Sequence, residues 1–144
     1  MSRKILVGYD GSPASRRALE FAIDRAKARG EDVLLAHVLE WSPYSFLTPN
    51  ELEERHRRRK EELERAETAI LKPAIAAVES TGVTIETVLK YGHIAETLCK
   101  LAEQNDVSLV IIGRTGDSAF SARIFGSVAG TLAQIAPVPV TIVP

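Results

Sequence analysis

A chain of 144 residues with a net charge of −1 predicts a single domain, residues 1–144, that can bury a sizeable core. Its charge provides no overall attraction to nucleic acid or to an anionic membrane, and its apolar content of 45% is ordinary for a globular protein. The single Cys99 excludes an intramolecular disulfide and suits a reducing compartment. With no signal-peptide pattern and no apolar run near roughly 18 residues, we expect a soluble cytoplasmic protein with no nucleic-acid or membrane partner.

The first apolar run, residues 5–7, predicts a short strand that is buried on both faces. Ser12 followed by Pro13 is typical of a helix start, and Gly30 is typical of the end of that helix. Asp10 therefore falls between the carboxyl end of a strand and the beginning of a helix. There its carboxylate can interact with the helix dipole or accept hydrogen bonds from a ligand, and the sequence leaves both interpretations open.

Residues 32–39 predict a second buried strand, which contains His37. A lone histidine in an apolar strand is more often a core residue than a catalyst or ligand, and no nucleophile pattern or second histidine at metal-ligand spacing accompanies it. Residues 41–50 predict a loop that either covers a ligand site or packs on the surface. The densely charged residues 51–65 predict a solvated helix, because glutamates lie three or four positions from its basic residues.

Strands and helices continue to alternate in the second half of the chain. Pro73 is expected to kink or restart the long helix, and further strands are predicted at residues 84–89, 109–112 and 138–143. Alternating strands and helices imply right-handed crossovers and a parallel sheet covered on both faces. We predict an α/β fold: a single-domain, three-layer, doubly wound, Rossmann-like sandwich with a five-stranded parallel sheet in the order 3-2-1-4-5. Ligands bind such sheets at the carboxyl ends of strands 1 and 4.

A glycine-rich stretch follows the fourth predicted strand. Gly113 ends the strand, Gly116 comes next, and Gly126 and Ser127 directly precede a helical pattern. Glycine lets backbone N–H groups approach an anion, and a helix start directs further N–H groups and a positive dipole end to the same place. A flexible strand-to-helix connection is the alternative. The predicted topology favours a phosphate site, because this stretch and residues 9–11 flank the same crevice.

The spacing from Gly113 to Ser127 is glycine, two residues, glycine, nine residues, glycine and serine. With VGYDGSP after the first strand, LLAHV in the second and APVPVTIV at the C-terminus, the full-length sequence resembles the universal stress protein family. The resemblance implies ATP binding, with magnesium bound through the phosphates. It places Asp10 beside the adenosine, the backbone of Val38 at the adenine edge, and the glycine signature around the ribose and phosphates. The implied cofactor-binding residues are Gly8, Tyr9, Asp10, Val38, Gly113, Arg114, Gly116, Gly126, Ser127, Val128 and Ala129.

The glycine loop is expected to bind a nucleotide rather than to catalyse a reaction. It lacks the lysine of a P-loop, and Asp117 is its only carboxylate, so we assign no catalytic and no metal-ligating residue. We therefore expect an ATP-binding regulatory protein of stress responses, not an enzyme, with at most slow ATP hydrolysis. One alternative is a nucleotidyl-transferase-like enzyme that cleaves ATP at the α-phosphate, although no SGGxDS loop follows the first strand. The other is an interaction module that binds no nucleotide.

The final predicted strand, residues 138–143, lies at an edge of the predicted sheet and carries no charge. An apolar edge strand is normally blunted, covered or paired. Pairing with the same strand of a second copy across a two-fold axis would satisfy its free backbone groups. We expect a homodimer through this strand, with further pairing of dimers into tetramers, and the family resemblance implies the same contact.

Overall fold

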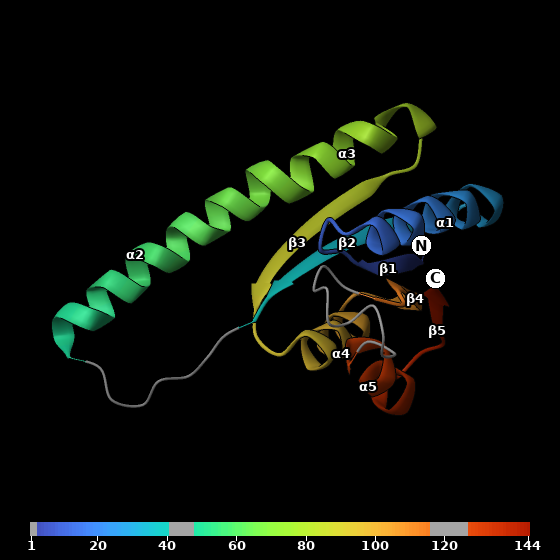
Figure 1. The fold of residues 1–144 in the computed structure, drawn as a ribbon. Helices are drawn as coiled ribbons and strands as arrows, with labels where there is room; N and C mark the ends of the chain where they lie inside the picture. Colours follow the sequence, from blue (N-terminus) through green and yellow to red (C-terminus); the bar gives the residue numbers. More distant parts are fainter. Residues whose placement is uncertain (1–2, 41–47, 116–126) are drawn as a thin grey trace.

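The computed structural model describes residues 3–40, 48–115 and 127–144. The described chain forms a five-stranded parallel sheet in the order β3-β2-β1-β4-β5, with helices on both faces (Figure 1). The predicted α/β architecture and strand order are therefore confirmed. The strands are β1 (Lys4–Gly8), β2 (Asp32–Leu39), β3 (Ile85–Tyr91), β4 (Val107–Gly113) and β5 (Val140–Val143).

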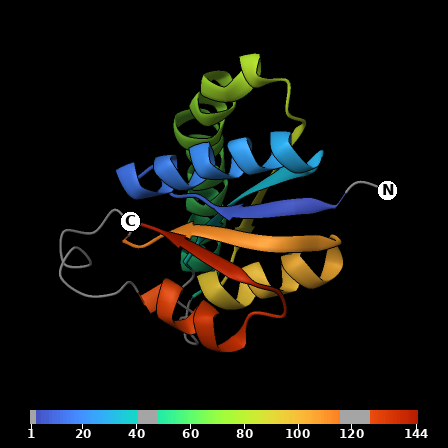
Figure 2. The ribbon, with the colours of Figure 1, turned by 90° about the vertical axis from the view of Figure 1, so that its right-hand side faces the viewer.

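Two apolar cores lie on opposite faces of the sheet. The helices α1 (Pro13–Arg29) and α3 (Lys72–Val78) pack on one face, and α4 (Ile94–Gln104) and α5 (Ser127–Ile135) pack on the other (Figure 2). Alternate residues of β1 separate accordingly, since Ile5 and Val7 join the first core and Leu6 joins the second. β1, β2 and β4 are buried on both faces, which explains why these three strands appear in the sequence as largely continuous apolar runs.

The ends of α1 follow the local sequence signals. The Ser12 hydroxyl accepts a hydrogen bond from the backbone N–H of Ser15 at 3.2 Å, and Pro13 occupies the first turn. Gly30 ends the helix with a φ of 66°, a left-handed conformation that glycine adopts without a Cβ penalty. The predicted boundaries of this helix are confirmed.

A long helical segment connects β2 to β3. It consists of α2 (Pro49–Ala66), a π-helical turn (Glu67–Leu71) and α3. In the π turn the N–H of Lys72 donates to the carbonyl of Glu67, five residues earlier. The wider turn lies directly before Pro73, which lacks an N–H and whose ring crowds the preceding turn of a regular helix. The predicted kink or restart at Pro73 takes the form of this π turn, and the backbone stays helical through it.

The charged half of this segment is solvated, as predicted. Arg58 and Glu54 form an ion pair at 2.8 Å with both side chains more than half exposed. α2 extends past the carboxyl end of β3 (Figure 1) and is attached there by Tyr91, whose hydroxyl lies 3.1 Å from the Arg59 carbonyl oxygen and 2.8 Å from the Glu62 carboxylate. The loop predicted at residues 41–50 ends earlier than expected, because Thr48 caps α2; residues 41–47 lie outside the described ranges.

The last strand begins later than predicted. β5 starts at Val140 rather than at residue 138, since Pro139 has no N–H for the ladder. The Pro139 carbonyl still accepts a hydrogen bond from the N–H of Val110 at 3.0 Å. As expected, β5 lies at an edge of the described sheet.

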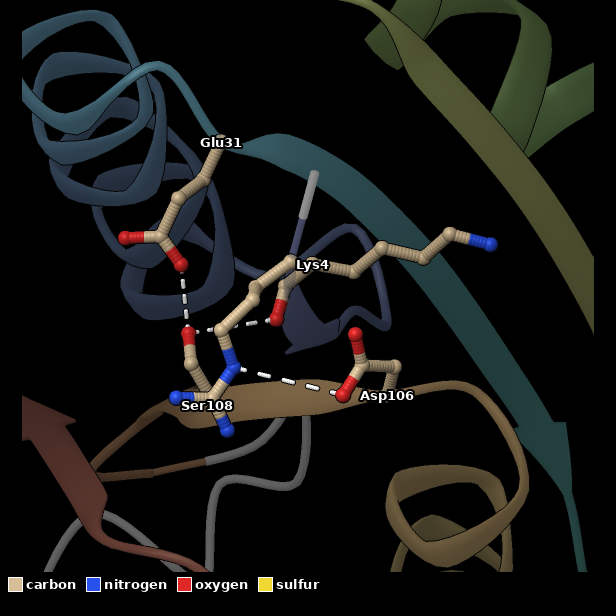
Figure 3. A network of polar contacts seen from close by, with 5 residues as sticks. Lys4, Glu31, Asp106 and Ser108 are labelled. Carbon is tan, nitrogen blue, oxygen red and sulfur yellow. Dashed lines mark hydrogen bonds and ion pairs between the residues drawn. The ribbon is translucent and has the colours of Figure 1, made fainter. Parts of the chain in front are cut away.

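The amino ends of the central strands are joined by polar contacts (Figure 3). The β1–β4 register shifts by one residue at Ser108, so this residue has no partner opposite it. Its hydroxyl oxygen lies 2.5 Å from the Glu31 carboxylate and 3.4 Å from the Lys4 carbonyl oxygen. Glu31 also pairs with Arg29 at 3.0 Å, and only 9% of its side chain is exposed. These contacts tie the amino ends of β1 and β4 to the loop that precedes β2.

Candidate functional site

A cavity of about 320 Å³ opens at the carboxyl ends of β1, β2 and β4. It lies at the switch point of the sheet, where β1 adjoins β4 and the strand order reverses. Its volume is in the range of ligand pockets. Its lining consists of Gly8, Tyr9, Asp10, Ser15, Ala36, His37, Val38, Glu40, Ile94, Leu98, Ile112, Gly113, Arg114, Thr115, Ser127, Val128 and Ala129.

The structure brings together every predicted site residue that it describes. Gly116 and Gly126, together with Asp117, lie outside the described residues. For all predicted site residues, described or not, contact with a ligand stays a prediction. The predicted residues that line the cavity are Gly8, Tyr9, Asp10, Val38, Gly113, Arg114, Ser127, Val128 and Ala129.

The floor of the cavity is apolar. Val38, Leu98 and Ile112 line it and also belong to the core beneath α4 and α5. Gly8 faces this floor, since a Cβ at that position would lie 3.0 Å from Ile112 Cγ2 and 3.1 Å from Leu98 Cδ1. A flat aromatic ring system could pack against such a surface.

Tyr9 contributes to the cavity differently from what its size suggests. It is 7% exposed and belongs to the core on the α1 face, opposite the cavity floor. Its ring therefore packs behind the sheet. The large side chain does not occupy the surface available to a ligand ring above Gly8.

Asp10 organises the turn between β1 and α1. One carboxylate oxygen accepts a hydrogen bond from the N–H of Ser12 at 2.9 Å, and Gly11 completes the turn with a φ of 81°. The Ser15 hydroxyl lies 3.4 Å from the N–H of Asp10 and donates to the Ser12 carbonyl at 3.0 Å. The other carboxylate oxygen of Asp10 has no hydrogen-bond partner among the described residues. The structure thus shows a role in the turn that the sequence did not indicate, and the two interpretations left open by the sequence, interaction with the helix dipole and contact with a ligand, stay predictions.

Gly113 has a packing role that the sequence did not indicate. A Cβ on Gly113 would lie 2.8 Å from the backbone C and the Cβ of Ala14, and 3.0 Å from the backbone N of Ser15. β4 therefore approaches the first turn of α1 too closely for any side chain. This approach brings the end of β4 beside the Asp10 turn and forms one wall of the cavity.

Another wall of the cavity is the start of α5. Ser127 is the first residue of the helix and is exposed, while Val128 and Ala129 follow it along the cavity. The first N–H groups of a helix have no partner within the helix and carry partial positive charge. They suit a phosphate or another anion.

Charged side chains occupy the rim. Arg114 is the only lysine or arginine among the described lining residues, and Asp10 and Glu40 are the acidic ones. Sequence reasoning missed Glu40, which follows the last residue of β2 and so lies at the carboxyl end of that strand. It also missed Ile94 and Leu98, which their spacing of four residues places on one face of α4.

The described parts of the chain contain no evident metal site and no membrane-spanning helix. Within them no cluster of three or more His, Cys, Asp or Glu residues could hold a metal ion. None of the helices in these ranges has the length and apolar character needed to cross a membrane. His37 is buried, as predicted. Cys99 is buried as well, and burial raises the pKa of its thiol.

Fold and cavity together define a doubly wound α/β protein with a ligand-sized cavity at its switch point. A model of the universal stress protein family matches residues 1–144, and the chain belongs to this family. A universal stress protein of Thermus aquaticus is 34% identical, with 99% of both chains covered.

Two solved structures are similar to the described fold. Universal stress protein UspA from Lactobacillus plantarum has a TM-score of 0.85 at 23% identity, covering 99% of this chain and 97% of that one. A universal stress protein in complex with cAMP has a TM-score of 0.70 at 25% identity, covering 99% of this chain and 96% of that one.

Proposed function

We propose that this protein binds an adenine nucleotide in the cavity and acts as a nucleotide-dependent regulatory protein of stress responses in the cytoplasm. The observation that carries the proposal is the cavity at the switch point, lined by both halves of the predicted nucleotide site. A family member of known structure that contains cAMP supports an adenine nucleotide as the ligand class.

The walls of the cavity suit different parts of such a ligand. The apolar floor at Val38 and Ile112 would pack against the base, and the backbone of Val38 would meet its edge. The free carboxylate oxygen of Asp10 would accept hydrogen bonds from the ribose hydroxyls. Ser127 and the first N–H groups of α5 would bind phosphate. We propose ATP as the ligand in the cell, with magnesium bound through its phosphates.

We propose a binding protein with at most slow ATP hydrolysis. Phosphoryl transfer requires a positioned nucleophile and charge stabilisation around the transferring group. The described rim offers one basic side chain, Arg114, and the carboxylate of Asp10 is engaged in the turn through one oxygen. The sequence left two other functions open: cleavage of ATP at the α-phosphate, and interaction with a partner without a nucleotide. The experiments below distinguish both from nucleotide binding.

We further propose a homodimer through β5, with dimers pairing into tetramers. β5 lies at the edge of the described sheet and consists of Val140, Thr141, Ile142 and Val143, all partly exposed. Antiparallel pairing with the same strand of a second copy would extend the sheet and satisfy the outward backbone groups.

The direct test is to purify the protein without added nucleotide, denature it, and analyse the released small molecules. Release of an adenine nucleotide, together with calorimetric binding of ATP to the emptied protein, is the expected result. Protein that releases no nucleotide and binds neither ATP nor cAMP would refute the proposal and favour the interaction module. Rapid formation of pyrophosphate from ATP would favour the transferase, whereas slow formation of ADP agrees with a binding protein.

A further inference from the structure

The buried histidine of β2 makes a contact that neither the fold nor the proposed ligand contacts explain. His37 Nδ1 lies 2.6 Å from the backbone carbonyl oxygen of Tyr9, shorter than the usual 2.9 Å for a hydrogen bond of this kind. A carbonyl oxygen only accepts, so Nδ1 carries the proton and donates. His37 Nε2 is buried and has no hydrogen-bond partner within residues 3–40, 48–115 and 127–144. The ring therefore makes one polar contact within the described structure, and that contact is to the turn after β1.

The Tyr9 peptide groups are held from several sides. The N–H of Tyr9 donates to the Ala36 carbonyl at 2.8 Å, while its own carbonyl accepts from His37. The N–H of the next peptide, at Asp10, lies 3.4 Å from the Ser15 hydroxyl. The Tyr9–Asp10 peptide is thus bound at its carbonyl by β2 and approached at its N–H by α1. Its orientation determines where the Asp10 side chain starts.

We infer that His37 is a positioning residue: its Nδ1–H fixes the Tyr9 carbonyl and thereby directs the Asp10 carboxylate into the nucleotide cavity. The inference rests on the proposed function of that cavity. Strand alternation places the His37 ring on the α1 face, whereas Val38 faces the cavity floor. His37 accordingly acts from behind the turn, and Asp10 makes the contact with the ligand.

An ordinary core histidine would behave differently. If burial of its ring were its whole contribution, a leucine of similar size would preserve ligand affinity and change stability alone. A positioning role depends on the N–H donor. Asparagine supplies such a donor, because its Nδ2 is attached to Cγ as Nδ1 is in histidine.

The experiment compares His37→Leu and His37→Asn by calorimetric titration with AMP and by thermal unfolding. We expect His37→Leu to weaken AMP binding about fivefold to tenfold, as for loss of one hydrogen bond. His37→Asn should remain within about threefold of the wild type. The control is Val33→Ala, a fully buried residue at the amino end of the same strand. It should lower the unfolding temperature and leave AMP affinity unchanged.

A double-variant cycle tests whether His37 acts through Asp10. Asp10→Ala alone should weaken AMP binding, and adding His37→Leu to it should cause no further loss. Equal losses from His37→Leu with and without Asp10→Ala would overturn the inference, as would unchanged AMP affinity in His37→Leu. The wild-type titration separates the two failures: if the wild type binds no adenine nucleotide, the proposed function fails, whereas the inference fails when the wild type binds AMP and the cycle gives either of these results.

A measurement on the ligand-free wild type covers the case in which His37→Leu fails to fold. Nitrogen-15 NMR of the imidazole ring should show a protonated Nδ1 and an unprotonated Nε2. Observation of the opposite tautomer would remove the donor and overturn the inference.

Discussion

Replacing Gly113 with alanine would test the close approach of β4 to α1 that forms one wall of the cavity. The added Cβ would lie 2.8 Å from the backbone C of Ala14 and 3.0 Å from the backbone N of Ser15. These are backbone atoms in the first turn of a helix, so neither can move aside by a side-chain rotation. The strand or the helix must shift as a unit.

Insertion of one methyl group into such a contact costs typically about 1–3 kcal/mol. We expect Gly113→Ala to lower the free energy of unfolding by about 2 kcal/mol, or roughly 6–8 °C in the unfolding temperature for a chain of this size. Gly8→Ala is the matched control, because its Cβ would meet the side-chain atoms Ile112 Cγ2 and Leu98 Cδ1 at 3.0 and 3.1 Å. These are side-chain atoms, which can give by a few tenths of an ångström without moving a strand or a helix, so the expected loss is smaller, about 1 kcal/mol.

Urea unfolding followed by circular dichroism measures both variants, and equal slopes of free energy against urea would show that the comparison is valid. If Gly113→Ala is as stable as the wild type, the wall of the cavity is not set by this contact. A larger loss for Gly8→Ala than for Gly113→Ala would also refute the reasoning, because it would reverse the order predicted from backbone and side-chain neighbours.

Three further changes test other parts of the structure. Ser127→Ala should weaken ATP binding about tenfold and leave adenosine binding unchanged in calorimetry, as expected for loss of one hydrogen bond to a charged phosphate; equal weakening of both ligands would remove Ser127 from that role. Burial and the hydrogen bond to Glu62 raise the pKa of Tyr91 to about 12, so between about pH 10 and 12 the unfolded chain releases a proton that the native state retains, and stability falls as the pH rises. Tyr91→Phe should reduce this fall in chemical unfolding at alkaline pH, and an undiminished fall would contradict the assignment. The double variant Thr141→Pro with Ile142→Lys should be monomeric by light scattering, since proline removes a ladder donor and lysine adds charge; a wild type that is monomeric at tens of micromolar, or a double variant that remains dimeric, would refute the interface.

Local sequence patterns were sufficient to predict the elements and their order. The Ser12-Pro13 pair and Gly30 bound α1 because capping involves groups only a few residues apart. Continuous apolar runs predicted strands buried on both faces, and alternation with helices predicted a parallel sheet. Topology then located the crevice, since parallel strands bring their carboxyl ends to one edge. Topology therefore assigned residues 9–11 and the glycine stretch to one crevice, and the family resemblance added Val38 and the start of the last helix.

Only the tertiary structure determined how those residues are oriented and which neighbours they contact. Tyr9 turns its ring away from the cavity, Gly113 is required by the first turn of α1, and Glu40 joins the rim. The bond between His37 and Tyr9 joins residues that are 28 positions apart, so no local pattern reports it. Such contacts depend on how closely two elements approach and on which face a side chain lies. Approach and orientation are set by the packing of the whole core, whereas the periodicity of the sequence specifies only that each strand and helix will form.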